Sequence, residues 1–280
     1  MVNPRVFIII LHYSSIKDTE ECLKSLKGLD YDNFKIIIVD NGTNHKIKPG
    51  DNVLIRSKEN IGFAAGNNIG IKYALDNKAD YVLLLNNDTV VHPNFLKELI
   101  GAGENNDKIG ILGPKIYYHN SNKTWFAGGK VNFFYTKGIH VFGKTDYITG
   151  CCMLIKKQVI NKIGLMHEPY FLYFEDADYC LNARRKGFKC MIVHSSKIWH
   201  KVSQSIKKDS FEYIYYNTRN GLLLCMRNAF FLLKIFVFLD YCFLMYIKQL
   251  IKLIIFPKNE WSKPIMLGIK DFYKSKFGKH

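Results

Sequence analysis

The stretch that decides the fold is residues 81–88, YVLLLNND, in which an apolar run leads directly into Asn86, Asn87 and Asp88. A continuous apolar run of this length is typical of a strand that is covered on both faces. Residues 5–11 (RVFIIIL) and 35–39 (KIIIV) have the same character. We therefore predict three buried strands in the first third of the chain.

Predicted helices separate these strands. Helical spacing of apolar residues covers 18–29, where Asp18 is the expected N-cap, and 63–75. Strands that alternate with helices predict an α/β protein with a doubly wound, mostly parallel sheet. Ligands of such sheets bind beyond the carboxyl ends of the strands, where Asp40 and Asp88 both fall.

The second half of the chain is more varied. Residues 109–150 are rich in Gly, Tyr and Phe, which predicts antiparallel strands at the sheet edge with a turn near Lys137 and Gly138. A last strand is expected at 189–193, with His200 in the loop beyond it. From Tyr213 onward the pattern is helical.

Composition excludes several classes of protein. Hydrophobic residues make up 48% of the 280 residues, which excludes a disordered chain. The seven cysteines form no CxxC pair, so neither a zinc module nor a disulfide framework is expected. We therefore expect a reducing, cytosolic setting. The apolar run 6–11 indicates a strand rather than a secretory leader.

The net charge of +16 is concentrated in the last hundred residues. Residues 1–180 carry 21 Lys and Arg against 19 Asp and Glu, whereas residues 181–280 carry 19 against 5. Such an excess of positive charge in the C-terminal part predicts contact with an anionic surface.

Three motifs contain residues that could carry chemistry. Asp88 follows a buried strand, where a carboxylate can hold Mg²⁺ or Mn²⁺ against a diphosphate; the alternative is a turn residue that caps the next helix. Residues 60–70 (NIGFAAGNNIG) combine glycines with a helix start, which favours an anion; the alternative is a simple loop-to-helix junction. These residues match neither a P-loop nor GxGxxG.

The third motif, residues 170–178 (YFLYFEDAD), sets three carboxylates beside aromatic residues. A partly dry wall would raise a carboxyl pKa and suit the group to general base work. The alternative is a solvated first helical turn, where acids favour the helix dipole. His200, one of nine histidines, needs a metal-site argument from elsewhere to be more than structural.

Taken together, these motifs resemble glycosyltransferase family 2, the inverting GT-A transferases, and above all its rhamnosyltransferase-like and galactofuranosyltransferase-like members. The resemblance covers roughly residues 5–220 and rests on the order of its pieces. They are 39–41 (VDN), 60–70, 84–89 (LLNNDT), 150–155 (GCCMLI), 171–178 (FLYFEDAD), His200 and 219–220 (RN). It implies a GT-A sheet with a Rossmann-like nucleotide-binding half and an acceptor half.

The resemblance also implies roles for individual residues. Asp40 would contact the nucleotide base. Asp88 and His200 would bind Mn²⁺ or Mg²⁺. Asp176 would be the catalytic base, with Glu175 beside it. The residues that would shape the nucleotide-sugar pocket are Asn60, Gly66, Asn67, Asn87 and Asp88.

Three positions depart from the family pattern. Asn86 replaces the first Asp of the DxD-like motif, and His12 begins a turn (HYS) where Asn-Tyr-Asn is usual. Asn182 stands where Arg is common, which removes an expected i,i+4 partner for Asp178. No QxxRW motif of processive synthases is present, so we expect transfer of one sugar per encounter.

The function implied is transfer of a sugar from a UDP- or dTDP-sugar to a hydroxyl of a glycan or lipid-linked acceptor in cell-surface polysaccharide biosynthesis. Two other functions remain open. A sugar nucleotidyltransferase would want a Gly-rich, Arg-containing loop after the first strand, and residues 12–17 (HYSSIK) contain neither. A non-catalytic module that binds a nucleotide sugar or glycan is the second.

We divide the chain into a catalytic domain, residues 1–220, and a helical, basic and apolar tail, residues 221–280. The tail's apolar run is broken by Arg227, Lys234, Asp240, Lys248 and Lys252, too often for a membrane span. A basic residue at a helix centre costs roughly 2.5–3.5 kcal/mol on insertion scales.

The spacing of these charges predicts one polar stripe on amphipathic helices that lie on an anionic membrane surface, on the cytoplasmic side. The alternative is a face buried against the catalytic domain or in a homodimer. Nucleic acid is not an expected partner, because aromatic and basic residues are segregated rather than interleaved.

Overall fold

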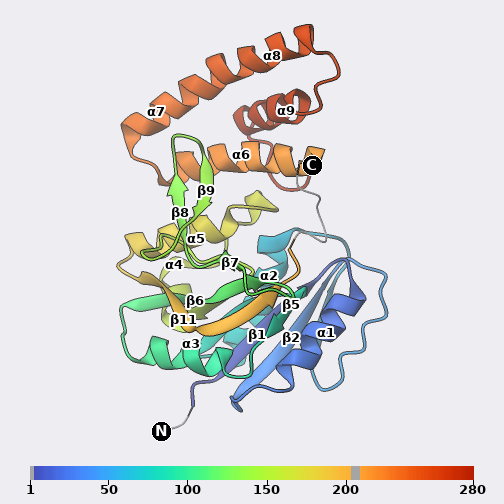
Figure 1. Cartoon of the computed structure of the whole chain (residues 1–280), viewed down its shortest axis with the longest axis vertical. Coiled ribbons are helices and arrows are strands. Elements are labelled where there is room, and N and C mark those ends of the chain that lie inside the picture. The colour runs from blue at the N-terminus through green and yellow to red at the C-terminus, as the bar shows by residue number, and fades with distance from the viewer. Residues whose placement is uncertain (1–2, 203–208) are drawn as a thin grey trace.

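The apolar run at the start of the chain forms the centre of a nine-stranded sheet in the computed structural model, which describes residues 3–202 and 209–280 (Figure 1). β1 (Val6–His12) pairs in parallel with β2 (Phe34–Asn41) on one side and with β4 (Tyr81–Asn86) on the other. Residues 6–10 are completely buried, as expected of a strand enclosed on both faces.

The strand order is β3-β2-β1-β4-β10-β6-β11-β5, and β7 pairs with β6. The first four strands are parallel, whereas β10 runs antiparallel to both β4 and β6. The α/β fold is therefore confirmed, with a sheet that is parallel over its first half and mixed beyond it. The remaining strands are β3 (Val53–Ser57), β5 (Thr89–Val91), β6 (Ile109–Tyr118), β7 (Thr124–Phe126), β10 (Cys152–Lys156) and β11 (Lys189–His200), with a separate hairpin of β8 (Gly129–Asn132) and β9 (Lys137–His140).

Two strand predictions were wrong. Residues 109–150 do not all lie at an edge, because β6 is inside the sheet, parallel to β11, with the apolar side chains of Ile111, Leu112 and Ile116 fully buried. The hairpin expected near Lys137 and Gly138 is present as β8–β9, with its turn at residues 133–136 directly before Lys137. His200 is not in a loop: β11 continues past a register shift to pair with β5.

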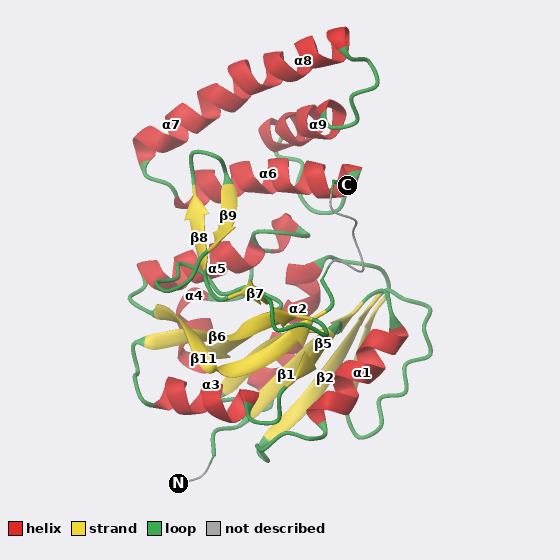
Figure 2. Ribbon diagram, viewed as in Figure 1, coloured by secondary structure: helices red, strands yellow, loops and turns green. Residues whose placement is uncertain are grey.

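Helices flank the sheet (Figure 2), and the first two along the chain lie near the positions expected from apolar spacing. The first begins two residues earlier than expected. Its N-cap is Ser15, whose hydroxyl accepts from the Asp18 N–H, so Asp18 lies inside the first turn. The helices over the sheet are α1 (Ile16–Leu26), α2 (Phe63–Asp76), α3 (Phe95–Glu104), α4 (Lys157–Ile163) and α5 (Glu175–Arg185), with a short 3₁₀ turn η1 (Glu168–Tyr170).

The C-terminal part is helical, as predicted, and lies as a layer beyond α5 (Figure 1). Its helices are α6 (Phe211–Asn228), α7 (Phe231–Leu239), the π-helix η2 (Asp240–Met245), α8 (Tyr246–Ile255) and α9 (Ser262–Tyr273). α7, η2 and α8 follow one another without a break and form the long rod of Figure 1. Of the helices in the described ranges, none is long and apolar enough to cross a membrane.

The helical layer is joined to the sheet by packing and by a hairpin. The β8–β9 turn reaches the layer, where Thr136 Oγ1 lies 2.9 Å from the hydroxyl of Tyr241. A Cβ at Gly221 would lie 2.5 Å from the Thr136 carbonyl, so this contact requires glycine. The boundary we drew between residues 220 and 221 falls inside α6.

Candidate active site

Asp40 lies at the end of β2 and is almost fully enclosed, with 1% of the residue exposed. Oδ1 accepts hydrogen bonds from the backbone N–H of Thr43 at 3.0 Å and from its hydroxyl at 2.8 Å. Oδ2 accepts one from Arg56 Nη1 at 3.0 Å, and the Arg56 side chain is half exposed. Both carboxylate oxygens are engaged, so Arg56 is the group of this cluster that reaches solvent.

His12 ends the neighbouring strand and is completely buried. Its Nδ1 lies 2.7 Å from the Thr19 hydroxyl and its Nε2 lies 2.9 Å from Nδ1 of His45. Burial lowers the pKa of His12, and the neighbouring His45 lowers it further. The departure from Asn-Tyr-Asn thus places a pair of imidazoles beside Asp40.

Residues 60–70 form a loop that runs into α2. Asn60 Oδ1 accepts from Asn41 Nδ2 and from the Gly62 N–H, both at 2.9 Å, which ties the loop to the end of β2. Gly66 lets α2 approach β1 closely, since a Cβ there would lie 2.5 Å from Leu11 Cδ1. Asn67 is 1% exposed and donates to the Phe63 carbonyl at 2.9 Å. The pocket roles of Asn60, Gly66 and Asn67 stay predictions.

The turn after β4 brings Asp88 to His200 on β11. His200 Nε2 lies 3.1 Å from Asp88 Oδ1, and the two side chains are 7% and 13% exposed. Neither Asp88 Oδ1 nor His200 Nδ1 has a hydrogen-bond partner in the described structure. Asn87, the residue before Asp88, points elsewhere: its Nδ2 donates to the Thr19 hydroxyl at 3.0 Å.

These two side chains fit a divalent cation. A buried carboxylate oxygen and an imidazole nitrogen that face each other without a hydrogen bond are arranged as two ligands of one ion would be. Within residues 3–202 and 209–280 no group of three His, Cys, Asp or Glu residues forms a metal cluster. Two protein ligands suffice where diphosphate oxygens and water complete the coordination, as is usual for Mg²⁺.

Asp176 lies in the first turn of α5. Its Oδ2 accepts from the Gly150 N–H at 2.8 Å and its Oδ1 from the Ala177 N–H at 2.7 Å. Burial raises the pKa of this carboxyl, and the backbone donors, followed by His140, oppose the rise. The side chain is half-buried, so it meets both protein and solvent.

Glu175, the residue before it, is more deeply buried, with 5% exposed and no hydrogen-bond partner for Oε2. Burial raises the pKa of Glu175 well above its usual range, and the charge of Asp176 adds to the rise. Glu175 is therefore the less solvated carboxyl of the pair, and burial favours its protonated form.

Two consecutive residues connect Asp176 to the Asp88 turn. The Cys151 carbonyl accepts from the Asn86 N–H at 2.9 Å, while the Gly150 N–H donates to Asp176. A Cβ at Gly150 would lie 2.9 Å from the Phe63 ring, so glycine is needed there. The predicted base and the predicted metal ligands are therefore held at one edge of the sheet.

Residues 7–164 match the family model described as glycosyl transferase family 2. This match covers more than half of the chain. The chain belongs to glycosyl transferase family 2.

Two curated relatives extend the likeness of this glycosyltransferase beyond the family model. It is 26% identical over 235 residues to the low-salt glycan biosynthesis hexosyltransferase Agl10 of Haloferax volcanii, across 77% of this chain and 74% of the relative. It is 26% identical over 247 residues to the dTDP-rhamnosyl transferase RfbF of Shigella flexneri, across 81% and 82%. The resemblance inferred from the motifs is confirmed.

The same fold occurs among solved structures. A mannosyltransferase from Pyrobaculum calidifontis, in complex with GDP-Man and Mn²⁺, superposes with a TM-score of 0.63 over 98% of this chain and 88% of that one. The two chains share 10% of their residues, so the likeness concerns the fold, which is of GT-A type.

Sequence reasoning missed two aromatic residues of this glycosyltransferase's candidate site. The Trp125 ring lies 4.6 Å from that of His200 and 5.4 Å from that of His140, edge-on to both. His140 Nδ1 lies 2.9 Å from the Trp125 carbonyl, and His140 is close enough to Asp176 to lower the pKa of that carboxyl. The only available signal was the aromatic content of residues 124–142, which does not reveal which rings meet.

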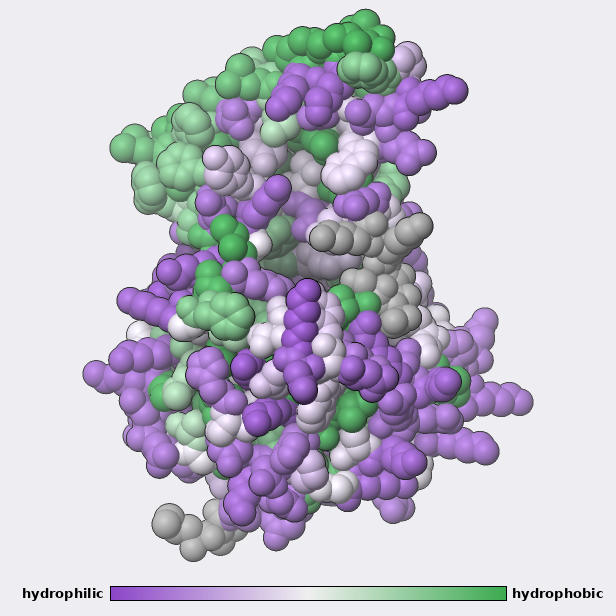
Figure 3. Space-filling model, viewed as in Figure 1, coloured by the Kyte–Doolittle hydropathy of each residue, from purple (hydrophilic) through white to green (hydrophobic). Residues whose placement is uncertain are grey.

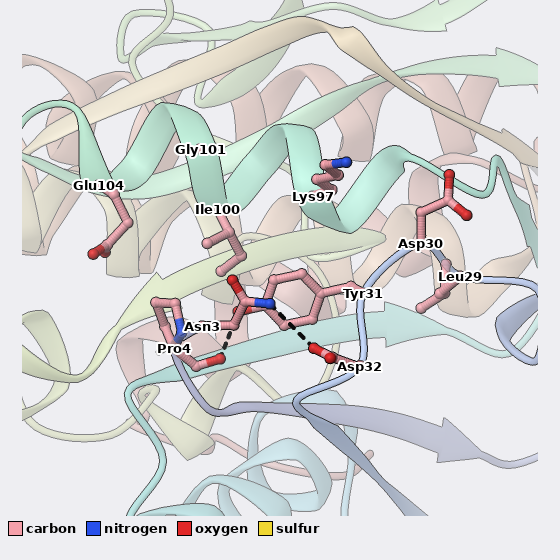
Figure 4. A pocket seen from close by; sticks show the side chains of 10 residues that line it. All are labelled: Asn3, Pro4, Leu29, Asp30, Tyr31, Asp32, Lys97, Ile100, Gly101 and Glu104. Atoms are coloured by element: carbon pink, nitrogen blue, oxygen red, sulfur yellow. Dashed lines mark hydrogen bonds between the residues drawn. The ribbon is translucent and has the colours of Figure 1, made fainter. Parts of the chain in front are cut away.

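A cavity of about 890 Å³ lies away from these residues (Figure 4). Its walls come from the segments before β1 and β2 and from α3, so it lies at the amino ends of the parallel strands. Asn3 Nδ2 donates to Asp32 Oδ1 across it at 3.1 Å. We assign the site to the opposite edge, because ligands of open α/β sheets bind beyond the carboxyl ends of strands.

Proposed function

We propose that this glycosyltransferase moves a single sugar from a UDP- or dTDP-sugar to a hydroxyl of a glycan or lipid-linked glycan, with inversion at the anomeric carbon. The observation that carries the proposal is the attachment of Asp176 and of the Asp88 turn to the consecutive residues Gly150 and Cys151. The dTDP-rhamnosyl transferase and hexosyltransferase relatives support a nucleotide-sugar donor and a role in cell-surface polysaccharide biosynthesis.

In this proposal Asp176 accepts the proton of the acceptor hydroxyl as that oxygen attacks the anomeric carbon. The bond between that carbon and the diphosphate oxygen breaks on the opposite face. The raised pKa of Asp176 makes its carboxylate a stronger base. Asp88 and His200 would hold Mn²⁺ or Mg²⁺, which when bound neutralises charge on the leaving diphosphate.

A panel of nucleotide sugars tests the proposal. Each donor is incubated with the protein and Mn²⁺, and thermal stabilisation and slow donor hydrolysis are measured. The anomeric configuration of the transferred sugar, determined by NMR, tests inversion. Stabilisation by no UDP- or dTDP-sugar would contradict the donor class, and a retained configuration would contradict the mechanism.

We further propose that the helical layer lies on the anionic, cytoplasmic face of the cell membrane. The α7–α8 rod carries a continuous set of exposed apolar side chains, here called the apolar face, which Figure 3 shows as a green surface over these helices. It consists of Phe231, Leu232, Ile235, Phe236, Phe238, Leu239, Phe243, Leu244, Ile247, Leu250, Ile251, Ile254 and Ile255. An exposed apolar patch of this extent marks a lipid or protein contact.

Charge favours lipid as the occupant. Exposed lysines lie on α8 and α9 and in the segments after them, namely Lys248, Lys258, Lys263, Lys270, Lys274 and Lys276. Each basic residue near an anionic bilayer contributes about 1 kcal/mol. A homodimer is the other candidate, but two copies would bring these lysines together. A membrane position would give access to a lipid-linked acceptor.

Arg227 is not part of the polar stripe that the sequence predicted. α6 ends at Asn228 and the next helix begins at Phe231, so the helical spacing is interrupted. The division into a catalytic part and a membrane-associating tail remains a proposal. α6 packs against α5 of the catalytic part and against α9 of the tail.

A further inference from the structure

The loop that leads into Asp176 has an unusual backbone. Phe171, Tyr173 and Phe174 have φ angles of 62°, 69° and 72°. Residues other than glycine rarely adopt positive φ, because the Cβ then crowds the backbone. Three such residues within four positions, next to a candidate base, persist only if surrounding contacts impose them.

Two adjacent residues of α6 supply these contacts. Asn220 Nδ2 donates to the carbonyls of Tyr170 at 2.7 Å and Leu172 at 2.6 Å. Arg219 Nη2 also donates to the Tyr170 carbonyl, at 3.0 Å. From the other side, the Phe63 N–H at the start of α2 donates to the Phe171 carbonyl at 2.7 Å. The loop is therefore held through its carbonyl oxygens rather than by its side chains alone.

Both residues are buried, and burying a polar or charged side chain costs free energy unless its groups are paired. Asn220 is 0% and Arg219 1% exposed. The guanidinium group lies 5.3 Å and 5.0 Å from the ring centres of Tyr215 and Tyr216, and its Nη1 donates to the Gly278 carbonyl at 2.8 Å. Carbonyls and aromatic rings thus take the place of water around the cation.

The same contacts tie the C-terminal segment to the loop. The Gly278 N–H donates to the carbonyl of Pro169, directly before the strained stretch, at 2.9 Å. Arg219 therefore bridges α6, the C-terminal segment and the loop. At its far end the loop enters α5 through Phe174, whose carbonyl accepts the Asp178 N–H at 2.9 Å.

We propose that Arg219 and Asn220 are positioning residues for the transfer reaction, which hold residues 170–174 in their strained form and so fix Asp176 at the acceptor. The inference rests on the proposed function, since it takes Asp176 as the base. Neither residue lies among the groups assigned to donor or metal binding. We call their hydrogen bonds to the carbonyls of residues 170–172 the clamp. Loss of the clamp should lower turnover and leave donor affinity unchanged.

The test is Asn220→Asp in the full chain, which keeps the side chain's shape but turns an oxygen toward the loop carbonyls. We expect kcat for transfer to fall about 100-fold, the usual cost of misplacing a reacting group by about 1 Å. The donor KM and the Kd of the nucleoside diphosphate should change less than about threefold, well under the effect of one lost charged contact. Hydrogen exchange should rise in residues 168–175 alone.

Asn217→Asp is the matched control. Asn217 lies one turn earlier on α6, and its Nδ2 donates to the Tyr213 carbonyl of its own helix at 2.8 Å. This variant should keep wild-type kcat and loop exchange. If Asn220→Asp does not fold, Arg219→Lys decides instead, because it keeps the charge but loses the planar fork, and a fall in kcat without a change in donor KM is again expected.

Wild-type kcat in Asn220→Asp, or equal losses in kcat and in donor affinity, would overturn the inference. So would unchanged exchange of the loop. Failure of the proposed function is recognised separately, since the wild-type chain would then transfer sugar from no donor while the exchange experiment would still report on the clamp.

Discussion

Arg227 Nε lies 3.1 Å and 3.2 Å from the two carboxylate oxygens of Asp178, although the residues are 49 positions apart. Asn228 Nδ2 donates to the same carboxylate at 2.6 Å. The family's usual partner, an Arg one turn later on α5, is replaced here by Asn182. The cation that is missing at position 182 of α5 is supplied by Arg227 of α6.

Substitution Arg227→Met should therefore destabilise the protein. The Asp178 side chain is 4% exposed and would lose its cation, while Arg227 is 33% exposed and Asn228 remains. We expect a loss of about 2 kcal/mol in the free energy of unfolding, measured by urea denaturation.

Adding Asn182→Arg to Arg227→Met should restore most of this loss. Asn182, Asp178 and Arg227 line one cavity of about 420 Å³, so an arginine at 182 has room to reach the carboxylate. A double variant that is no more stable than Arg227→Met would show that the position of the charge, not its presence, matters.

Asp176→Asn should abolish transfer and leave donor binding nearly intact, because the amide keeps the shape of the carboxylate but accepts no proton. Turnover and isothermal titration with the donor are the two measurements. Asp76→Asn, at an exposed position at the end of α2, is the control. Retention of more than about a tenth of wild-type turnover would exclude Asp176 as the general base, whose loss typically costs 10²–10⁴-fold.

Asp88→Ala and His200→Ala should both weaken nucleoside-diphosphate binding in the presence of Mn²⁺, by about 10- to 100-fold, and chelation should stop transfer. His194→Ala provides a matched control, since His194 is exposed on the same strand, β11. Transfer that continues unchanged in excess chelator would rule out the metal and leave Asp88 as a turn residue.

Glu175 should make stability depend on pH. Burial, and then the charge of Asp176, raise the pKa of Glu175 above its value in the unfolded chain. A carboxyl of this kind stabilises the fold fully below its unfolded pKa, and the contribution is lost as pH rises through the folded pKa. The glutamine of Glu175→Gln cannot ionise. The difference in unfolding free energy between this variant and wild type should therefore favour the variant more at pH 8 than at pH 5.

Urea denaturation at both pH values measures the difference. The exposed residue Glu59 provides the control, and Glu59→Gln should behave as wild type at both pH values. An equal offset between Glu175→Gln and wild type at pH 5 and pH 8 would mean that Glu175 is ionised alike in the folded and unfolded states.

The apolar face should bind vesicles that contain anionic lipid, and the binding should weaken with salt. Phe236→Glu with Ile254→Glu should abolish flotation with such vesicles, because charges would enter the acyl region. Phe142→Glu, at an exposed apolar position in the loop after β9, should not. Absence of lipid binding, with a dimer in sedimentation that the double variant dissociates, would assign the face to a subunit interface.

The sequence was sufficient for the features that depend on local order. Continuous apolar runs separated by helical segments predicted the strands. The motifs at Asp88 and Asp176 predicted two residues of the candidate site. The contact of Asp88 with His200 was implied only by family resemblance, because it depends on the pairing of β5 with β11 across more than a hundred residues.

Features that depend on distant packing could not be predicted from the sequence. The Arg227–Asp178 pair joins two helices. The Trp125 ring reaches His200 through the pairing of β7 with β6, and His140 approaches Asp176 from β9. The contacts of Arg219 and Asn220 with residues 170–174 could not be predicted either, because a phenylalanine at position 171 gives no indication of a positive φ angle. Apolar periodicity records burial, not the partner of a buried side chain.

The course of α6 has a consequence for recombining this enzyme with its relatives. One helix carries Arg219 and Asn220 toward the loop before Asp176 and, a turn or two later, Leu222 and Cys225 into the apolar cluster of the helical layer. In a chimaera joined between residues 220 and 221, the part of α6 that contacts the loop and the part that packs in the apolar cluster would come from different proteins. A joint at Ala229 and Phe230, where the helix ends, would keep that helix whole and exchange the apolar face together with α9 and the Gly278 carbonyl that Arg219 binds. The apolar face and the catalytic residues could then come from different parents.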